Sequence, residues 1–129
     1  MSANLTANEL GRFLEDRVRS SGANAVIFYN DLAAHFNLPE VDERWLQHPL
    51  CKLFEVLDHE DARKVSPFRT ALVISKDKNM PGAGFFKVVP ELRNPKPKLY
   101  TETEKMKFFI DELHALAKCY SPIKQVSQQ

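Results

Sequence analysis

The chain has 129 residues, of which 43% are hydrophobic and 27% are charged, and its net charge at pH 7 is +1. This length predicts a single domain over residues 1–120 with one modest core, followed by a flexible tail over residues 121–129. No apolar run reaches the roughly 18 residues that a membrane helix needs, and the N-terminal residues lack the pattern of a signal peptide. Two widely separated cysteines are typical of a cytoplasmic protein with free thiols.

The charges are unevenly distributed along the chain. Residues 1–68 hold seven basic and eleven acidic residues, a net charge of −4, whereas residues 69–107 hold nine basic and four acidic residues, a net charge of +5. We therefore expect an acidic partner to meet the middle segment of the chain.

The N-terminal segment predicts a helix, a short strand and a second helix. Thr6 and Glu9 form a capping box, apolar residues then recur at helical spacing up to Val18, and Gly22 is expected to end the helix. The run over 25–28 is apolar and rich in β-branched residues, which favours a short strand. The second helix is expected over 31–36.

A third helix is expected from about Val41, with a break at Pro49 and a renewed helix that begins there. An apolar stripe from Trp45 to Leu57 supports this helix. The polar residues 58–61 are then expected to form a turn and a short polar helical segment with local ion pairs.

The stretch from Phe68 to Val89 predicts a β-hairpin. Residues 69–76 alternate and are rich in β-formers, residues 77–84 hold the turn, and residues 85–89 form the returning strand. The two glycines of the turn, Gly82 and Gly84, are expected either to adopt a positive φ or to permit a close approach of the backbone.

Residues 101–120 give the clearest helical pattern in the chain. Thr101 and Glu104 form a second capping box, and apolar residues from Met106 to Tyr120 recur at spacings of three and four. The fold class expected is α+β, a winged-helix-like domain with three helices, a two-stranded β-hairpin wing and a C-terminal helix.

Two segments carry a resemblance to known families. Tyr29–Ala34 with Leu38–Pro39 resembles the opening of winged-helix domains, and the hairpin segments 71–76 and 80–86 resemble those of a small bacterial winged-helix-like family of uncharacterised function. The resemblance covers roughly residues 25–120, and it implies a small bacterial or mobile-element protein that associates with DNA.

More remotely, the order of elements is similar to that of the DNA-binding half of alkylguanine alkyltransferases. That family carries a Pro-Cys-His-Arg motif where this chain reads Ser66-Pro-Phe-Arg-Thr70. Thiolate alkyl transfer needs an activated cysteine beside a base, and neither residue is present here. We therefore expect a non-enzymatic protein, and only the architecture is carried over.

Two clusters contain residue types that can carry chemistry. His48, Cys51, His59 and Asp61 contain metal-ligand types, but a small residue on a helix and a histidine in a turn explain them better, so no metal or cofactor is expected. Asp58, Glu60 and Asp61 offer carboxylates for acid–base work, but a solvated helix end explains them better.

Nucleic-acid binding is the leading functional hypothesis. Lysines of the wing and of the linker after it are expected to contact phosphates of double-stranded DNA, and residues of the third helix are expected to reach base edges. The expected contacts are Arg44, Gln47, Lys76, Lys78, Asn79, Lys87, Lys96 and Lys98.

Three carboxylates weaken the contribution of the third helix to this hypothesis. Glu40, Asp42 and Glu43 lie where that helix would approach DNA, so binding is expected mainly through the basic wing. The alternative is a protein-interaction module, an adaptor or inhibitor, that uses Met80–Pro81 and residues 95–97. The charge asymmetry also suits a homodimer. A further alternative is that the lysines only keep the protein soluble and bind no partner.

Overall fold

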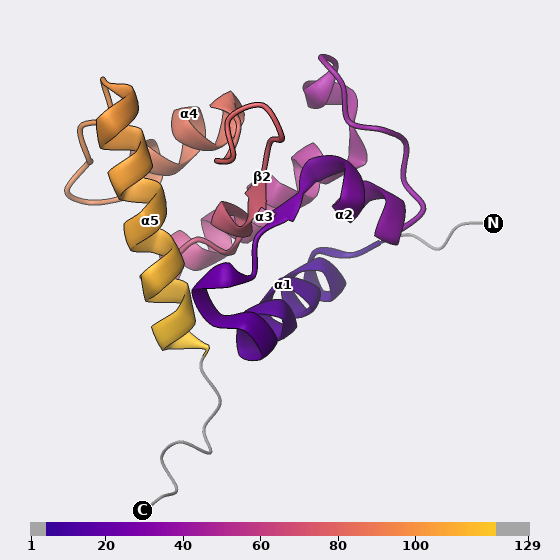
Figure 1. Cartoon of the computed structure of the whole chain (residues 1–129), viewed down its shortest axis with the longest axis horizontal. Helices are drawn as coiled ribbons and strands as arrows, with labels where there is room; N and C mark the ends of the chain where they lie inside the picture. The colour runs from indigo at the N-terminus through magenta and orange to yellow at the C-terminus, as the bar shows by residue number, and fades with distance from the viewer. Residues whose placement is uncertain (1–4, 121–129) are drawn as a thin grey trace, which may run out of the picture.

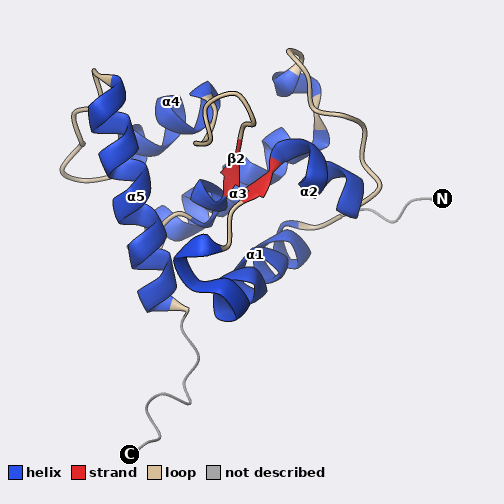
Figure 2. Cartoon of the chain, viewed as in Figure 1, coloured by secondary structure: helices blue, strands red, loops and turns tan. Residues whose placement is uncertain are grey.

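A computed structural model describes residues 5–120, so the predicted tail over 121–129 lies outside the described residues. Helices surround a very small sheet (Figures 1 and 2). The α-helices are α1 (Ala7–Ser21), α2 (Tyr29–His35), α3 (Pro49–Arg63), α4 (Ala83–Leu92) and α5 (Glu102–Cys119), and the strands are β1 (Ile27–Phe28) and β2 (Val73–Ile74). Short 3₁₀ turns cover Gly22–Asn24, Trp45–Gln47 and Arg69–Leu72.

Both predicted capping boxes are confirmed. The Thr6 side chain accepts a hydrogen bond from the Glu9 amide at 3.1 Å, and the Glu9 carboxylate accepts one from the Thr6 amide at 3.0 Å. The same reciprocal pair joins Thr101 and Glu104 at the start of α5. Gly22 ends α1 with a φ of 59°, a conformation that favours glycine.

The prediction for the third helix is confirmed in part, because the renewed helix begins at Pro49 but the segment before it is not α-helical. The segment expected to begin it near Val41 is extended chain and a 3₁₀ turn, and α3 begins at Pro49, capped by the His48 ring, which accepts from the Leu50 amide at 3.0 Å. Over 58–61 the predicted turn is wrong but the predicted helical segment is confirmed, because α3 continues through Arg63. Asp58 and Asp61 face the interior, where polar groups of residues 69 and 70 satisfy them.

The predicted hairpin is also wrong. Its first strand is reduced to β2, which pairs in parallel with β1, Ile27 opposite Val73 and Phe28 opposite Ile74. Residues 85–89, expected to return as a strand, lie in α4. The wing is therefore absent from the described residues. The fold contains both helices and strands, but it is mostly helical and has one small parallel sheet.

The physical reason lies in the pattern of α4. A short apolar run fits either a strand or a helix, and here Phe85 and Val89, four residues apart, are the buried pair. Pro90 is tolerated in the last turn of the same helix. Of the two expectations for the glycines, close approach is correct: Gly82 has a φ of −74°, and a Cβ on Gly82 or Gly84 would lie 3.3 Å from Tyr29 or Trp45.

The core forms where α1, α3, α5 and the small sheet meet. Leu10, Leu14 and Val18 give the buried face of α1, as the sequence predicted. The predicted C-terminal helix is confirmed, and its Leu116 joins the same core cluster. Phe109 of α5 packs in a second, smaller cluster with Ile74 and Met80.

Three consecutive residues, Phe68, Arg69 and Thr70, tie the helices together, and each contacts a buried carboxyl group. The Phe68 amide donates to Glu112 of α5 at 2.9 Å, and the Thr70 hydroxyl donates to Asp58 of α3 at 2.6 Å. We call these residues the 68–70 segment.

Arg69 is the centre of this segment and is only 4% exposed. Its guanidinium pairs with Glu15 of α1 at 2.8 Å and with Glu60 and Asp61 of α3 at 2.9 and 3.0 Å. Burial lowers the pKa of Arg69, but the hydrogen bonds and charge of Asp61 outweigh it, so the net shift is upward and the side chain stays charged. One cation therefore neutralises carboxylates from two helices.

The close approach of α1 to this guanidinium requires Gly11. A Cβ at that position would collide with Nη1 of Arg69 and would lie 3.3 Å from Leu57 Cδ2. The three ion pairs hold the guanidinium in place, so it has little room to move away.

We expect Gly11→Ala to destabilise the fold by about 1–3 kcal/mol because the added methyl overpacks the Arg69 site. Helix propensity alone would instead make the variant more stable, because it favours alanine over glycine by about 1 kcal/mol. Urea unfolding of the variant measures the effect, with Ser20→Ala on the exposed surface of α1 as the control. A Gly11→Ala protein as stable as the wild type contradicts the packing.

Candidate functional site

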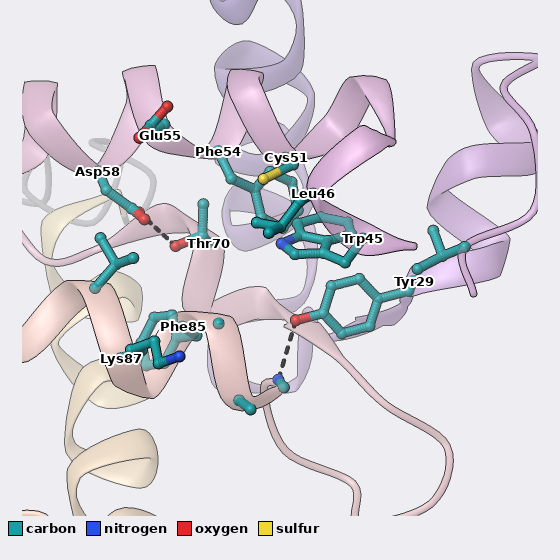
Figure 3. A pocket seen from close by; sticks show the side chains of 15 residues that line it. Tyr29, Trp45, Leu46, Cys51, Phe54, Glu55, Asp58, Thr70, Phe85 and Lys87 are labelled. Atoms are coloured by element: carbon teal, nitrogen blue, oxygen red, sulfur yellow. Dashed lines mark hydrogen bonds between the residues drawn. The ribbon is translucent and has the colours of Figure 1, made fainter. Parts of the chain in front are cut away.

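A pocket of about 390 Å³ opens between α3 and the start of α4, and α2 and residues 41–46 complete its walls (Figure 3). Its volume lies within the range of roughly 300–1,000 Å³ that is usual for small-molecule sites. Most side chains that line it are apolar or aromatic, and its polar lining residues include Asp58 and Thr70.

The helical spacing of α3 explains one wall. Cys51, Phe54 and Asp58 are three and four residues apart, so they share the face that α3 presents to the pocket. The opposite wall is formed by residues 82–85, where two glycines allow the chain to pass close to Tyr29 and Trp45.

Three aromatic rings from different elements pack against one another at the pocket. Trp45 lies edge-on to Tyr29 at 5.6 Å and to Phe54 at 5.3 Å between ring centroids, and the Tyr29 and Phe54 centroids are 6.2 Å apart. The Gly82 amide donates to the Tyr29 hydroxyl at 3.0 Å, which fixes the ring against the start of α4. The walls are thus held together before any ligand arrives.

Asp58 lies at the other end of the pocket from Tyr29 and Trp45 (Figure 3). It is 4% exposed, and its Oδ1 accepts from the Thr70 hydroxyl at 2.6 Å. Within residues 5–120, Asp58 forms no ion pair, and no hydrogen-bond donor to its Oδ2 is found. Oδ2 therefore keeps some exposure, because no fully buried side-chain oxygen or nitrogen of these residues lacks a partner. Burial raises the pKa of Asp58 from 3.8 to about 7, against the effect of the Thr70 hydrogen bond.

The other reactive groups of the lining are not activated. Burial and the charge of Glu55 raise the pKa of the Cys51 thiol, which disfavours the nucleophilic thiolate. Burial likewise raises the pKa of Tyr29.

The structure places three of the predicted DNA contacts on one loop. Lys76, Lys78 and Asn79 are exposed between β2 and α4, and Asn79 adopts a φ of 56°. The Lys76 ammonium lies 5.3 Å from the centroid of the Phe28 ring.

The remaining predicted contacts are spread over other elements. Arg44 is paired with Asp42 at 3.1 Å and Lys96 with Glu91 at 2.6 Å, so the charges of these two cations are locally neutralised. Gln47 and Lys98 are exposed, and Lys87 of α4 lines the pocket.

The candidate metal ligands are not brought together. In the part of the chain that the structure describes, no group of three or more His, Cys, Asp or Glu side chains could hold a metal ion. His48 caps α3 and contacts the Pro39 carbonyl at 2.7 Å, whereas His59 contacts the Glu55 carbonyl. Cys51 and Cys119 are both free thiols. None of the helices within residues 5–120 is long and apolar enough to span a membrane.

Sequence reasoning missed Asp58, Thr70, Tyr29 and Trp45 as parts of one site. One signal was present: Asp58 and Asp61 follow Phe54 and Leu57 by four residues, so the apolar stripe of α3 continues into two carboxylates. The partners of those carboxylates come from a separate segment, and no local pattern reveals that contact.

The raised pKa of Asp58 makes stability depend on pH. The folded protein holds this proton more tightly than the unfolded chain, so the contribution is complete below about pH 4 and is lost as pH rises through about 7. We expect wild-type unfolding free energy to fall relative to that of Asp58→Asn by up to about 4 kcal/mol between pH 4 and 8. Urea unfolding of both proteins measures the difference, and parallel pH profiles contradict the burial of an uncompensated carboxyl.

Comparison with known proteins does not assign a family or a function to this chain. No protein-family model, curated protein or solved structure matches the chain. The resemblance to winged-helix proteins therefore stays a prediction, and the function has to be inferred from the site itself.

Proposed function

We propose that this domain is a non-enzymatic binding protein whose pocket receives one small, largely apolar organic molecule. The single observation that carries the proposal is the aromatic pocket with one buried carboxyl group at its end. Concave, mainly apolar sites with few polar groups are the usual form of small-molecule sites. The packed rings and the Tyr29–Gly82 hydrogen bond support a largely preformed pocket, which lowers the entropic cost of binding.

Two potential nucleophiles of the lining, the Cys51 thiol and the Tyr29 phenol, are not activated, which supports binding over catalysis. The thiol of Cys51 and the phenol of Tyr29 are both held towards their protonated forms. Leu46, which is 86% exposed, extends the apolar surface at the pocket.

Trp45 is the single tryptophan of the chain and lines the pocket, so its fluorescence reports occupancy. We expect 2-phenylethanol to change this fluorescence saturably. Cys51→Phe fills part of the pocket and is expected to weaken binding about tenfold or more. Cys119→Phe makes the same change on the exposed end of α5 and leaves binding intact. Binding by neither 2-phenylethanol nor its amine analogue 2-phenylethylamine, or equal binding by wild type and Cys51→Phe, refutes the proposal.

Nucleic-acid binding is the second candidate, favoured by the exposed loop that carries Lys76 and Lys78. This loop is not the tip of a β-hairpin, so any such binding is expected to rest on phosphate contacts and to depend strongly on salt. A low-salt titration of duplex DNA with Lys76→Glu plus Lys78→Glu tests it: binding lost relative to wild type supports the contact, and unchanged affinity excludes it. A winged-helix relation and a protein partner remain predictions.

A further inference from the structure

The ligand class can be inferred from how the buried carboxyl groups are neutralised. Asp61 pairs with Arg69 at 3.0 Å, and Glu112 pairs with Arg93 at 3.2 Å. Asp58, equally buried, has only the neutral Thr70 hydroxyl. Burying a carboxylate without a cation costs free energy, so Asp58 is stable either in its protonated form or when a ligand supplies a positive charge.

No cation of the described residues forms an ion pair with Asp58, although the nearby charges of His59 and Arg69 favour its ionised form. The guanidinium of Arg69 is already shared among Glu15, Glu60 and Asp61. Lys87 lines the same pocket, but it is exposed and forms no ion pair with Asp58 in the described chain. Glu55, also in the lining, adds a second negative charge.

The rest of the pocket suits the body of an organic cation. Oδ2 of Asp58 has no donor within residues 5–120, and the Asp58 side chain is part of the lining, so a ligand group at that end can donate to it. Tyr29, Trp45 and Phe54 offer ring faces and edges to an aromatic or alkyl body, and such rings also attract cations. A carboxylate ligand would instead meet Asp58 as a like charge.

We propose that the pocket binds a monovalent organic ammonium with an aromatic or alkyl body, with its ammonium group against Asp58 and its body against Trp45 and Tyr29. This inference rests on the proposed function and names its ligand class. The ammonium replaces the missing protein cation and donates a charge-assisted hydrogen bond to Oδ2.

Two probes of matched size test the charge requirement. 2-Phenylethylamine carries the ammonium, and 2-phenylethanol replaces it with a neutral hydroxyl. At pH 8, where Asp58 is largely ionised, we expect wild-type protein to bind the amine at least about tenfold more tightly than the alcohol, read by Trp45 fluorescence. Asp58→Asn is expected to lose this preference while it still binds the alcohol.

Asp111→Asn is the matched control, because it removes the same charge from an exposed position on α5. It is expected to keep the preference for the amine. Equal affinity of wild-type protein for the two probes, or a preference that survives in Asp58→Asn, overturns the ammonium inference alone. Failure of both probes to bind overturns the proposed function with it.

The pH profile of the wild-type protein keeps the inference testable if Asp58→Asn does not fold. The titratable and charged groups around Asp58 are Glu55, His59, Asp61, Arg69, Tyr29 and Lys87. Amine affinity is expected to rise about tenfold from pH 6 to 8 as Asp58 ionises, whereas alcohol affinity changes little and controls for the other groups. Equal slopes for the two probes contradict the inference.

Discussion

The fold depends on the contact between the 68–70 segment and carboxyl groups from three helices. Glu15 of α1, Asp58, Glu60 and Asp61 of α3, and Glu112 of α5 all converge on these three residues. Breaking a buried pair of this kind leaves charges without partners, which typically costs about 3–5 kcal/mol. The segment therefore fixes where α1, α3 and α5 lie relative to one another, and the apolar core fills the space between them.

This network also determines where the candidate site lies. Arg69 and Arg93 neutralise Asp61 and Glu112, so those carboxylates stabilise the fold and are not available to a ligand. Asp58 lines the aromatic pocket and is held by a neutral hydroxyl, so within residues 5–120 this buried carboxyl group has no ion-pair partner. Perturbed ionisable groups in clefts are frequent at functional sites, and here the geometry gives the perturbation a physical cause.

Local patterns predicted the helices well and the tertiary contacts poorly. Both capping boxes, the end of α1 at Gly22 and the stripe of α5 depend on neighbours in the sequence, so they were recognisable. The prediction for residues 85–89 is wrong because four apolar residues around Lys87 fit a strand or a helix, and packing of Phe85 and Val89 decides between them. The turn predicted within 58–61 is wrong because the partners of these residues, Arg69 and Thr70, reach them only in the folded protein.

The state of the Asp58 carboxyl group tests this description most directly. Carbon-13 NMR can follow its titration, with the signal assigned by its loss in Asp58→Asn. In the absence of ligand we expect a midpoint near the Asp58 pKa of about 7, and with saturating 2-phenylethylamine a midpoint lower by about one unit or more, because the ammonium stabilises the ionised form. A carboxyl group that titrates near its ordinary pKa of 3.8 in the free protein, or whose midpoint is unchanged when the amine is bound, contradicts it.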